Sequence, residues 1–228
     1  MESDYKIHPK TLPAKDYWGQ VKRTVNGQPI LDREIEVIVN AITRNLLLTN
    51  QGSDVLLDLG CGNGALSERI FNTLHAFFGV DYSEYLISVA KRDFEKAPDF
   101  CFEVGDVLDY VLAEKIPERF TKVLCYGCFS YFPDPEKLLA ILSQRFINAS
   151  HVFIGNLPDR ERAELFYKNG LPGDEELTDF DSKIGVWRSQ QEIREMAQKA
   201  GWEARFSFMP QGFFNSHYRY DVTLIRNS

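Results

Sequence analysis

The stretch Val55-Leu56-Leu57-Asp58-Leu59-Gly60-Cys61-Gly62-Asn63-Gly64-Ala65-Leu66-Ser67 decides the fold of this 228-residue chain. Its first part places four apolar residues around one acid, which is typical of a parallel strand covered on both faces. Three glycines at alternate positions follow, and they predict a tight turn where the backbone approaches a ligand closely. The last residues predict the start of a helix. The stretch therefore indicates a strand, a ligand-binding turn and a helix in succession.

This arrangement resembles the first motif of the Rossmann-like class I S-adenosylmethionine (SAM)-dependent methyltransferases. The alternative is a nicotinamide or flavin dinucleotide site, whose G-x-G-x-x-G fingerprint receives a pyrophosphate on backbone amides and a helix N-terminus. Here the spacing is G-x-G-x-G, and Asp58 ends the strand just before the turn. Its carboxylate would repel a pyrophosphate, whereas it suits the ammonium and sulfonium groups of SAM. The resemblance therefore implies SAM as the cofactor and S-adenosylhomocysteine (SAH) as its product.

Strands and helices alternate along most of the chain, which predicts a parallel sheet with right-handed crossovers. Strands are predicted at 54–59, 76–81, 100–105, 121–126, 151–155, 203–208 and 218–225. Helices are predicted at 31–48, 64–73, 83–95, 107–115, 135–146 and 159–168, and from the capping box at 189–192 to just before Gly201. The last two strands are joined by a short loop, so they must be antiparallel. We therefore expect an α/β fold with a doubly wound seven-stranded sheet, mostly parallel with one antiparallel strand near the C-terminus, plus a small cap.

The expected domain organisation is one methyltransferase domain over residues 31–228, preceded by a lid segment over residues 1–30. A cap insertion is expected at about 156–187, where a Gly/Pro-rich stretch follows the fifth strand. Tyr17 and Trp18 are large aromatic residues in an otherwise polar segment. We expect this segment to close over the carboxyl edge of the sheet when ligands bind.

Composition restricts the partners of this chain. Its hydrophobic content of 44% is ample for a core, and its formal net charge is -7. An acidic chain lacks the basic footprint that phosphate binding needs, which argues against nucleic acid as the main partner. The sequence shows neither a signal-peptide pattern nor an apolar run as long as a membrane span. We therefore expect a soluble, cytoplasmic protein that acts on a small molecule.

The four cysteines are Cys61, Cys101, Cys125 and Cys128. Three of them lie in or beside predicted buried strands, which favours reduced core thiols. Cys125-x-x-Cys128 matches half of a zinc or redox motif, but no second Cys/His pair at ligand spacing accompanies it. Carboxylates are also too few after the fourth and fifth strands for a catechol-type divalent-metal site. We therefore expect no metal.

The resemblance assigns cofactor roles to residues at the strand ends. Asp81 ends the second strand about 20 residues after Gly60, the distance at which an acid receives ribose hydroxyls. In the family, an acid at the position of Asp106 accepts a hydrogen bond from the adenine amino group. Helix capping is the alternative for both acids. The cofactor-binding set implied in this way is Asp58, Gly60, Cys61, Gly62, Asp81, Tyr82, Asp106, Val107, Tyr126 and Gly127.

The methyl acceptor is expected to lie under the N-terminal segment, the cap insertion and the loop 210–217. The alternative is that the aromatic residues of these segments only cover the edge of the sheet. Residues expected to contact the acceptor are Tyr17, Trp18, Arg23, Phe129, Tyr131, Asn156 and Phe214.

His217 is the candidate general base, because histidine changes its charge near neutral pH. It lies on one face of the last predicted strand together with Arg219 and Asp221, since side chains alternate along a strand. Arg219 and Asp221 are expected to pair on the surface.

The expected function is SAM-dependent transfer of a methyl group to an oxygen or nitrogen of a small-molecule metabolite. The D/N-P-P-Y box of many amino-methylating enzymes is absent, and Tyr126-Gly127-Cys128-Phe129 stands in its place. The alternatives are a non-catalytic SAM-binding regulatory subunit and, less favoured by Asp58 and the glycine spacing, a dinucleotide-binding oxidoreductase.

Overall fold

The computed structural model describes residues 4–49, 51–167 and 169–226, and it divides into two compact units, Met1–Lys115 and Ile116–Ser228. The first unit carries β3 (Asp54–Leu59), β4 (Leu74–Asp81) and β5 (Phe100–Val104). The second unit carries β6 (Lys122–Tyr126), β7 (His151–Pro158), β8 (Trp202–Ser207) and β9 (Arg219–Arg226).

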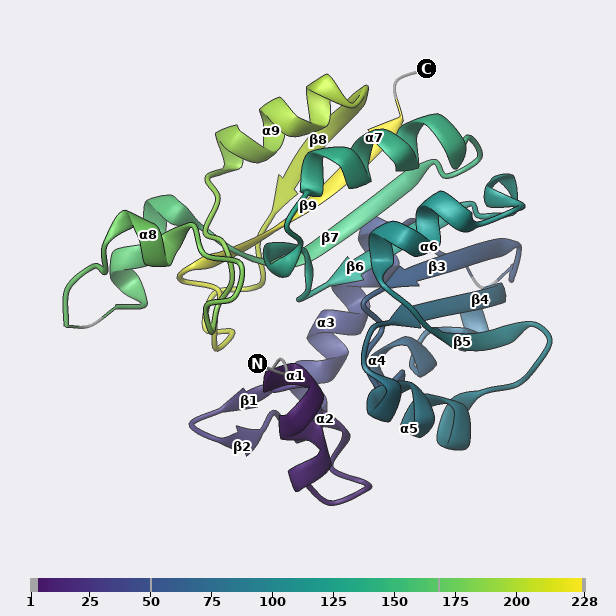
Figure 1. Cartoon of the computed structure of the whole chain (residues 1–228), viewed down its shortest axis with the longest axis horizontal. Coiled ribbons are helices and arrows are strands. Elements are labelled where there is room, and N and C mark those ends of the chain that lie inside the picture. The colour runs from purple at the N-terminus through teal and green to yellow at the C-terminus, as the bar shows by residue number, and fades with distance from the viewer. Residues whose placement is uncertain (1–3, 50, 168, 227–228) are drawn as a thin grey trace. The chain divides into compact units, whose positions relative to one another are not determined.

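These seven strands form a sheet with the order β5-β4-β3-β6-β7-β9-β8 (Figure 1). The pairs β3–β4, β4–β5 and β6–β7 are parallel, and β9 runs antiparallel to both β7 and β8. The predicted doubly wound sheet with one antiparallel strand is therefore confirmed. Its strand bounds also agree with the predicted ones to within two or three residues.

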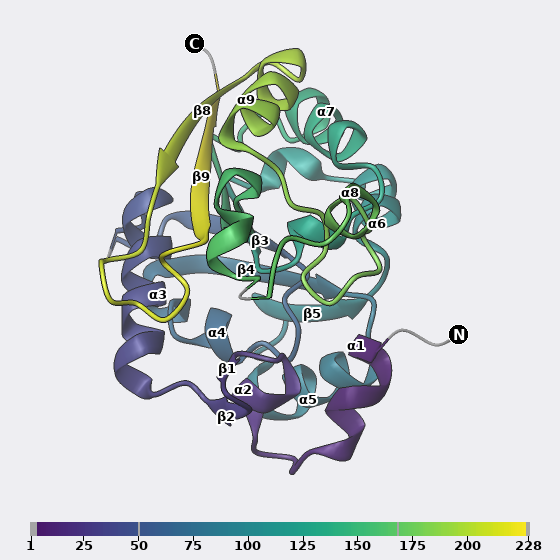
Figure 2. The same ribbon diagram turned by 90° about the vertical axis from the view of Figure 1, so that its left-hand side faces the viewer.

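Helices cover both faces of the strands in the first unit. They are α3 (Asp32–Asn45), α4 (Ala65–Glu68), the 3-10 turn η2 (Phe71–Thr73), α5 (Glu84–Phe94) and α6 (Val107–Ala113). Helices α5 and α6 lie on opposite faces of β4 and β5 (Figures 1 and 2). Ser83 caps α5 through its hydroxyl, which accepts a hydrogen bond from the Leu86 amide.

The N-terminal segment of the first unit folds into short elements rather than one helix. These are α1 (Asp4–Ile7), η1 (His8–Thr11), α2 (Tyr17–Gln20) and the hairpin strands β1 (Thr24–Val25) and β2 (Gln28–Pro29). Gln20 is fully buried, and its side-chain amide donates to the carbonyls of Pro13 and Ala14. Elements of four residues or fewer leave no hydrophobic periodicity, which explains why the sequence predicted none.

Helices α7 (Pro135–Arg145) and α9 (Gln190–Lys199) of the second unit pack side by side (Figure 1). Asp134 caps α7, and Ser189 with Glu192 forms the predicted capping box of α9. The indole of Trp202 in β8 is buried, and its N–H donates to the Leu139 carbonyl of α7 at 3.1 Å. The shorter elements of this unit are η3 (Pro117–Arg119), η4 (Phe129–Tyr131), η5 (Arg160–Leu165) and α8 (Asp174–Leu177).

The cap insertion differs from its prediction in one element. The helix expected at 159–168 is the shorter 3-10 turn η5, in which the Arg162 amide donates to the Asp159 carbonyl at 3.0 Å. After this turn, Phe166 and Tyr167 pack against the fully buried Trp187. The backbone is still helical at Phe166, and the Tyr167 amide donates to the Ala163 carbonyl at 3.1 Å, so both rings reach Trp187 from a single helical turn after η5.

An aromatic cluster packs against the glycine turn of the first unit and holds it in place. Phe71, Phe77 and Phe102 form a contiguous cluster, with ring centroids of Phe77 and Phe102 5.2 Å apart. A Cβ atom added at Gly64 would lie 2.7 Å from the Phe102 ring. The turn can therefore rest on this cluster only because Gly64 carries no side chain.

We predict that Gly64→Ala destabilises the fold more than Gly27→Ala. Both glycines have positive φ angles, 76° and 77°, so alanine costs roughly 1–2 kcal/mol at either position. Only at Gly64 does the added methyl group meet a side chain, which adds about 1–3 kcal/mol of overpacking. Urea unfolding of both variants measures the difference. Equal losses would show that Phe102 moves aside freely.

Candidate functional site

The glycine turn connects β3 to α4 and folds back over the end of β4. The amides of Gly60 and Cys61 both donate to the Val80 carbonyl, at 2.8 and 3.1 Å. Gly60, Gly62 and Gly64 all have positive φ angles, which non-glycine residues rarely adopt. The alternate glycines noted in the sequence therefore make the turn tight enough to lie beside the end of β4.

Asp81 ties this turn to the start of α5. Its side chain is 6% exposed, and its two oxygens accept hydrogen bonds from the amides of Gly62 at 3.0 Å and Ser83 at 2.9 Å. Burial raises the pKa of Asp81, whereas the two amide bonds and the charge of Lys6 act in the opposite direction. Each carboxylate oxygen has a second lone pair, so Asp81 retains capacity to accept from a ligand hydroxyl.

Asp58 is the second buried carboxylate beside the turn. It accepts a hydrogen bond from the hydroxyl of Ser67 in α4. Burial raises the pKa of Asp58 from 3.8 to about 7, against the lowering effects of the Ser67 bond and the Arg23 charge. Burial and the two nearby carboxylates also raise the pKa of the Cys61 thiol. A cation at this turn would therefore be electrostatically favoured.

The N-terminal segment contacts the turn directly. The side-chain amide of Asn63 donates to the Tyr17 carbonyl at 2.8 Å and to the Gln20 side chain at 3.0 Å. A Cβ atom added at Gly62 would lie 2.9 Å from Val21, so Val21 packs onto the turn. Arg23 stacks on Trp18, with the guanidinium 5.7 Å from the ring centroid, and its charge acts on Asp58 as described above.

Tyr17 contacts α5. Its hydroxyl donates to Asp93 at 2.9 Å, and its ring centroid lies 5.2 Å from that of Phe94. Lys15 and Arg92 also bind Asp93, and the Arg92 bond is the main cause that lowers the pKa of this carboxyl. The structure therefore brings Trp18 and Arg23 toward the glycine turn and holds Tyr17 against the neighbouring helix.

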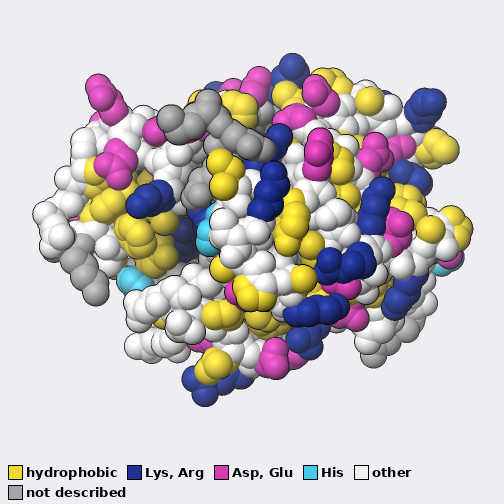
Figure 3. Space-filling view, turned by 60° about the horizontal axis from the view of Figure 1, so that its bottom comes forward, with side chains coloured by type: hydrophobic (Ala, Val, Ile, Leu, Met, Phe, Trp, Pro, Cys, Tyr) yellow, Lys and Arg dark blue, Asp and Glu magenta, His cyan; other side chains and the backbone are white. Residues whose placement is uncertain are grey.

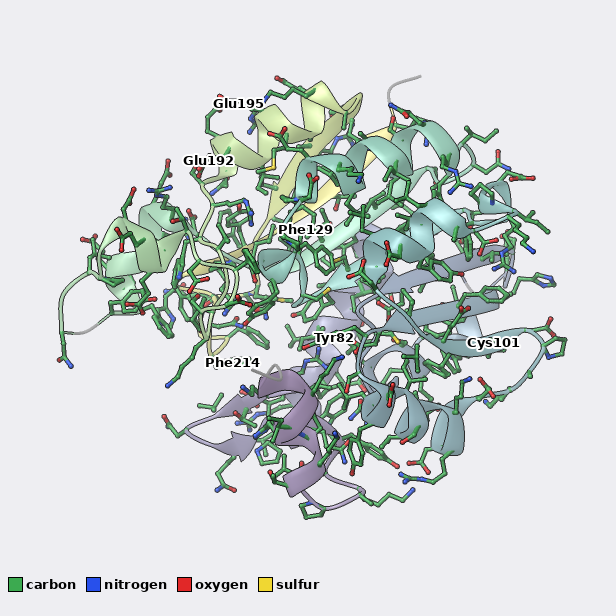
Figure 4. The ribbon with its side chains drawn as sticks, in the orientation of Figure 1. Tyr82, Cys101, Phe129, Glu192, Glu195 and Phe214 are labelled. Carbon is green, nitrogen blue, oxygen red and sulfur yellow. The ribbon has the colours of Figure 1, made fainter. Side chains whose placement is uncertain are left out.

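The remaining predicted cofactor residues of this unit follow β4 and β5. Tyr82 is 37% exposed, and the Lys6 ammonium lies 5.2 Å from its ring centroid (Figure 4). Asp106 caps α6 by accepting from the amides of Leu108 and Asp109, as the alternative interpretation predicted. The Gly105 amide donates to the Asp81 carbonyl at 3.0 Å, so the ends of β4 and β5 lie together.

In the second unit, the ends of β6 and β7 meet at Gly127 and Asn156. The Gly127 amide donates to the Gly155 carbonyl at 3.0 Å, and Tyr126 is buried against Gly155. Asn156 has a φ angle of 66° and lies where the register of β7 and β9 shifts between Ile154 and Leu157. A non-glycine residue in this conformation at a bulge is a feature that often marks a functional site.

Two residues that sequence reasoning did not assign hold Asn156 in place. Asp221 accepts a hydrogen bond from the Asn156 amide at 2.7 Å, and Asn215 donates to the Asn156 side chain at 2.7 Å. The expected position of Asp221 on the surface is wrong, because Asp221 is 2% exposed and bonds to the amide at the bulge. The sequence carried no signal for this burial, because Arg219 and His217 precede Asp221 and make this strand end read as polar.

His217 lies on the exposed loop before β9, beside a cavity of about 560 Å³. Its ring packs edge-on against Tyr218, with centroids 4.8 Å apart. The Arg162 guanidinium covers the Phe208 ring at 4.6 Å on the same cavity, and Phe214 is a further lining residue (Figure 4). The predicted residues His217 and Phe214 therefore face one common space.

Phe129 and Tyr131, which were also expected to contact the acceptor, lie in η4 and do not line that cavity. Phe129 in η4 is 1% exposed and packs edge-on against Phe132, with centroids 6.0 Å apart. The Tyr131 hydroxyl donates to the Lys183 carbonyl at 2.9 Å, which connects η4 to the cap insertion. Both side chains therefore make contacts within the protein, Phe129 with Phe132 and Tyr131 with Lys183.

Sequence reasoning also missed the aromatic core of the cap. It consists of Phe166, Tyr167, Trp187 and Tyr218, with neighbouring ring centroids between 4.9 and 5.9 Å apart. Hydrophobic side chains gather at the left of Figure 3, where the segment with η5 and α8 lies. The aromatic residues were visible in the sequence, but nothing in their spacing indicated that they meet.

The described residues contain no group of three or more His, Cys, Asp or Glu side chains that could hold a metal ion. Every helix in the described ranges is too short or too polar to cross a membrane.

Known proteins are similar to this chain in sequence and in fold. The sequence profile of a family described as a methyltransferase domain matches residues 56–145. A ubiquinone biosynthesis O-methyltransferase of Pseudomonas fluorescens (strain SBW25) is 27% identical over 151 residues, which cover 62% of this chain and 65% of that protein. The match therefore spans slightly less than two thirds of that relative.

Solved structures show the same fold at lower identity. The magnesium protoporphyrin IX methyltransferase ChlM from Synechocystis PCC 6803, with bound SAH, has a TM-score of 0.65 and 16% identity, covering 92% of this chain and 93% of that chain. The (4+2)-cyclase SpnF has a TM-score of 0.60 and 13% identity, covering 83% and 80% of the respective chains.

We predict that Asp58→Asn changes the pH dependence of folding. Between pH 3.8 and about 7 the folded chain holds a proton on Asp58 that the unfolded chain has released, so this group stabilises the fold at acidic pH and loses that effect as the pH rises. Asparagine does not titrate. From pH 4 to pH 8, the stability of wild type should therefore fall relative to the variant by on the order of 1–4 kcal/mol.

Urea unfolding of both proteins at several pH values gives this difference directly. Parallel pH profiles would show that Asp58 is ionised in the folded chain at acidic pH, contrary to the effect expected from its burial.

Proposed function

We propose that this chain is a class I SAM-dependent methyltransferase and that it transfers a methyl group from SAM to an oxygen atom of a small molecule. The observation that carries the proposal is the glycine turn with two buried carboxylates, Asp58 and Asp81, at the ends of neighbouring parallel strands. The names of the similar ubiquinone biosynthesis enzymes support oxygen over nitrogen as the acceptor atom.

The residues of the first unit fit SAM in shape and charge. The turn has no side chains at Gly60, Gly62 and Gly64, so a ligand can approach its backbone closely where Val21 of the proposed lid moves away from Gly62. Asp81 has the acceptor capacity for the two hydroxyls of a ribose, and the buried Asp58 suits a cation. Tyr82 offers a partly exposed ring for an adenine. These contacts are the ones that the resemblance implied.

Bound SAM supplies a methyl group that its sulfonium already activates for displacement. The protein then has to align two reactants and exclude water, which together lower the barrier by several kcal/mol. For this role we assign the glycine turn with Asp58 and Asp81 to the cofactor, together with Tyr126 and Gly127 as the resemblance implies. We assign the cavity beside His217 and Phe214 to the acceptor.

His217 is proposed as the general base that removes the proton of an acceptor hydroxyl. It is exposed on a loop whose neighbouring residues are anchored, since Asn215 is 4% exposed and bonded to Asn156. Asn156 is the proposed acceptor-positioning residue, because its strained backbone is held in place by Asp221 as well. A base of this kind contributes roughly 10²–10⁴-fold to the rate.

The segment 4–30 is proposed to act as a lid over the cofactor. Its contacts with the turn and α5 are mostly polar, and they run through Asn63, Gln20, Tyr17 and Asp93. The bonds of Lys15 and Tyr17 to Asp93 lie near the surface, where water can replace them, so the segment is proposed to open there and to close again over the turn through the buried bond of Asn63 to Gln20.

The proposal is tested by binding and turnover. Calorimetry should show binding of SAM and SAH and no binding of NAD. Incubation with SAM labelled in its methyl group and a panel of phenols, catechols, carboxylic acids and amines should label oxygen acceptors, and chelation of divalent metals should not reduce the rate. The similarity to a cyclase shows that this fold also serves other chemistry, so a protein that binds SAH without labelling any acceptor would favour the regulatory alternative.

We predict that Asp81→Asn weakens SAH binding by about 1–3 kcal/mol, because a charged hydrogen-bond partner is lost. Asp109→Asn is the matched control, since Asp109 carries the same charge on an exposed position of α6. Calorimetric titration of both variants gives the affinities, and circular dichroism verifies that each is folded. An unchanged affinity in folded Asp81→Asn would restrict Asp81 to its structural bonds with Gly62 and Ser83.

A further inference from the structure

Two cysteines meet at the end of β6. Their Sγ atoms, from Cys125 and Cys128, lie 3.0 Å apart, and neither residue is in a disulfide. The residues between them form a tight turn in which Gly127 has a φ angle of 80°. This turn brings the two side chains of a C-x-x-C sequence onto the same side.

The two thiols differ in accessibility. Cys125 is 1% exposed within β6, where it lies opposite Ile154 of β7. Cys128 precedes η4 and is half-buried. A disulfide reagent in solution therefore reaches Cys128 first. Cys125 then lies close enough to react with the mixed disulfide that forms on Cys128.

The turn that carries the thiols is bound to the residues assigned to the acceptor. The Gly127 amide donates to the Gly155 carbonyl, and a Cβ atom added at Gly127 would lie 3.5 Å from the side-chain nitrogen of Asn156. A Cβ atom added at Gly155 would lie 2.3 Å from the Tyr126 ring. A movement of the turn therefore acts on the Gly155 carbonyl, next to Asn156 in the chain, and on the Tyr126 ring that packs against Gly155.

We propose that Cys125 and Cys128 form a reversible redox-modification site that reacts with a low-molecular-weight disulfide and that its oxidation weakens binding at the cofactor site. The thiolate of Cys128 attacks one sulfur of the reagent, and one reagent thiol leaves. The sulfur of Cys125 then attacks the Cys128 sulfur of the mixed disulfide, and the second reagent thiol leaves. The two protons released by the cysteines end on the two departing thiols, so the reagent is reduced by two electrons and the pair is oxidised by two.

Oxidation must displace the turn. Bonded sulfurs lie about 2.05 Å apart, which is about 1 Å closer than the thiols in the reduced protein. Cys125 is held in the middle of the sheet, so most of the movement falls on the segment from Tyr126 to Cys128. This effect rests on the proposed function, in which Tyr126 and Gly127 contact the cofactor, whereas the formation of the disulfide does not.

The site is tested by treating the protein with glutathione disulfide, alkylating the remaining thiols and digesting with trypsin. The fragment 123–137 contains both cysteines and no internal Lys or Arg. It should be recovered without alkyl groups and lighter by two hydrogen atoms, and dithiothreitol should reverse the change. Affinity for SAH, measured by calorimetry, should fall at least fivefold on oxidation and return on reduction.

Two variants serve as controls. Cys128→Ser should bind SAH equally before and after treatment, because it cannot close the bond. Cys101→Ser should respond as the wild type does, since Cys101 lies on β5, away from the pair in the sequence. Full alkylation of the fragment, or glutathione retained on Cys128, would overturn the proposal, as would an SAH affinity unaffected by a bond that does form. Failure of the reduced protein to bind SAH would instead contradict the proposed function.

Discussion

The carboxylate of Asp81 connects the parts of the first unit that form its ligand-binding edge. One oxygen holds the glycine turn at Gly62, and the other holds the start of α5 at Ser83. The carbonyl of the same residue accepts the Gly105 amide from the end of β5. A single residue thus fixes the relative positions of the turn, the next helix and the next strand. A buried carboxylate in this role has to be hydrogen-bonded, and the turn provides the donor because its glycines allow the amide to face inward.

Three ionisable groups, Asp58, Cys61 and Asp81, lie beside the glycine turn, and burial disfavours the charged form of each. Burial raises the pKa values of Asp58, Cys61 and Asp81, the charge of Asp81 further raises those of Asp58 and Cys61, and the charge of Asp58 raises that of Cys61. The N-terminal segment supplies the opposing charges, since Arg23 acts on Asp58 and Lys6 acts on Asp81. The segment is therefore coupled electrostatically to the turn as well as bonded to it through Asn63. This coupling gives a physical reason why a cationic ligand and the segment would influence each other.

In the second unit, hydrogen bonds hold Asn156 in a backbone conformation with a positive φ angle. Asn156 adopts a conformation that an asparagine tolerates better than most residues, and Asp221 and Asn215 satisfy its backbone and side chain. The bulge displaces the end of β7 from regular pairing with β9, which frees the Asn156 amide for Asp221. The neighbouring Gly127 has to be a glycine for its own backbone, and it leaves room for the Asn156 amide as well.

The sequence by itself determined the sheet, the position of the glycine turn and the acids at or just after the ends of β3, β4 and β5. These features follow from local patterns, because apolar runs, glycine spacing and capping residues act on neighbours along the chain. Only the tertiary structure decided that Asp221 is buried, that Tyr17 binds α5, that the cap closes on Trp187 and that Cys125 and Cys128 come within 3.0 Å. Asp221, Tyr17 and Trp187 depend on residues that are distant in sequence, and the cysteine pair depends on the backbone of one turn. Periodicity carries no information on such contacts, since they are set by which side chains fill the same space.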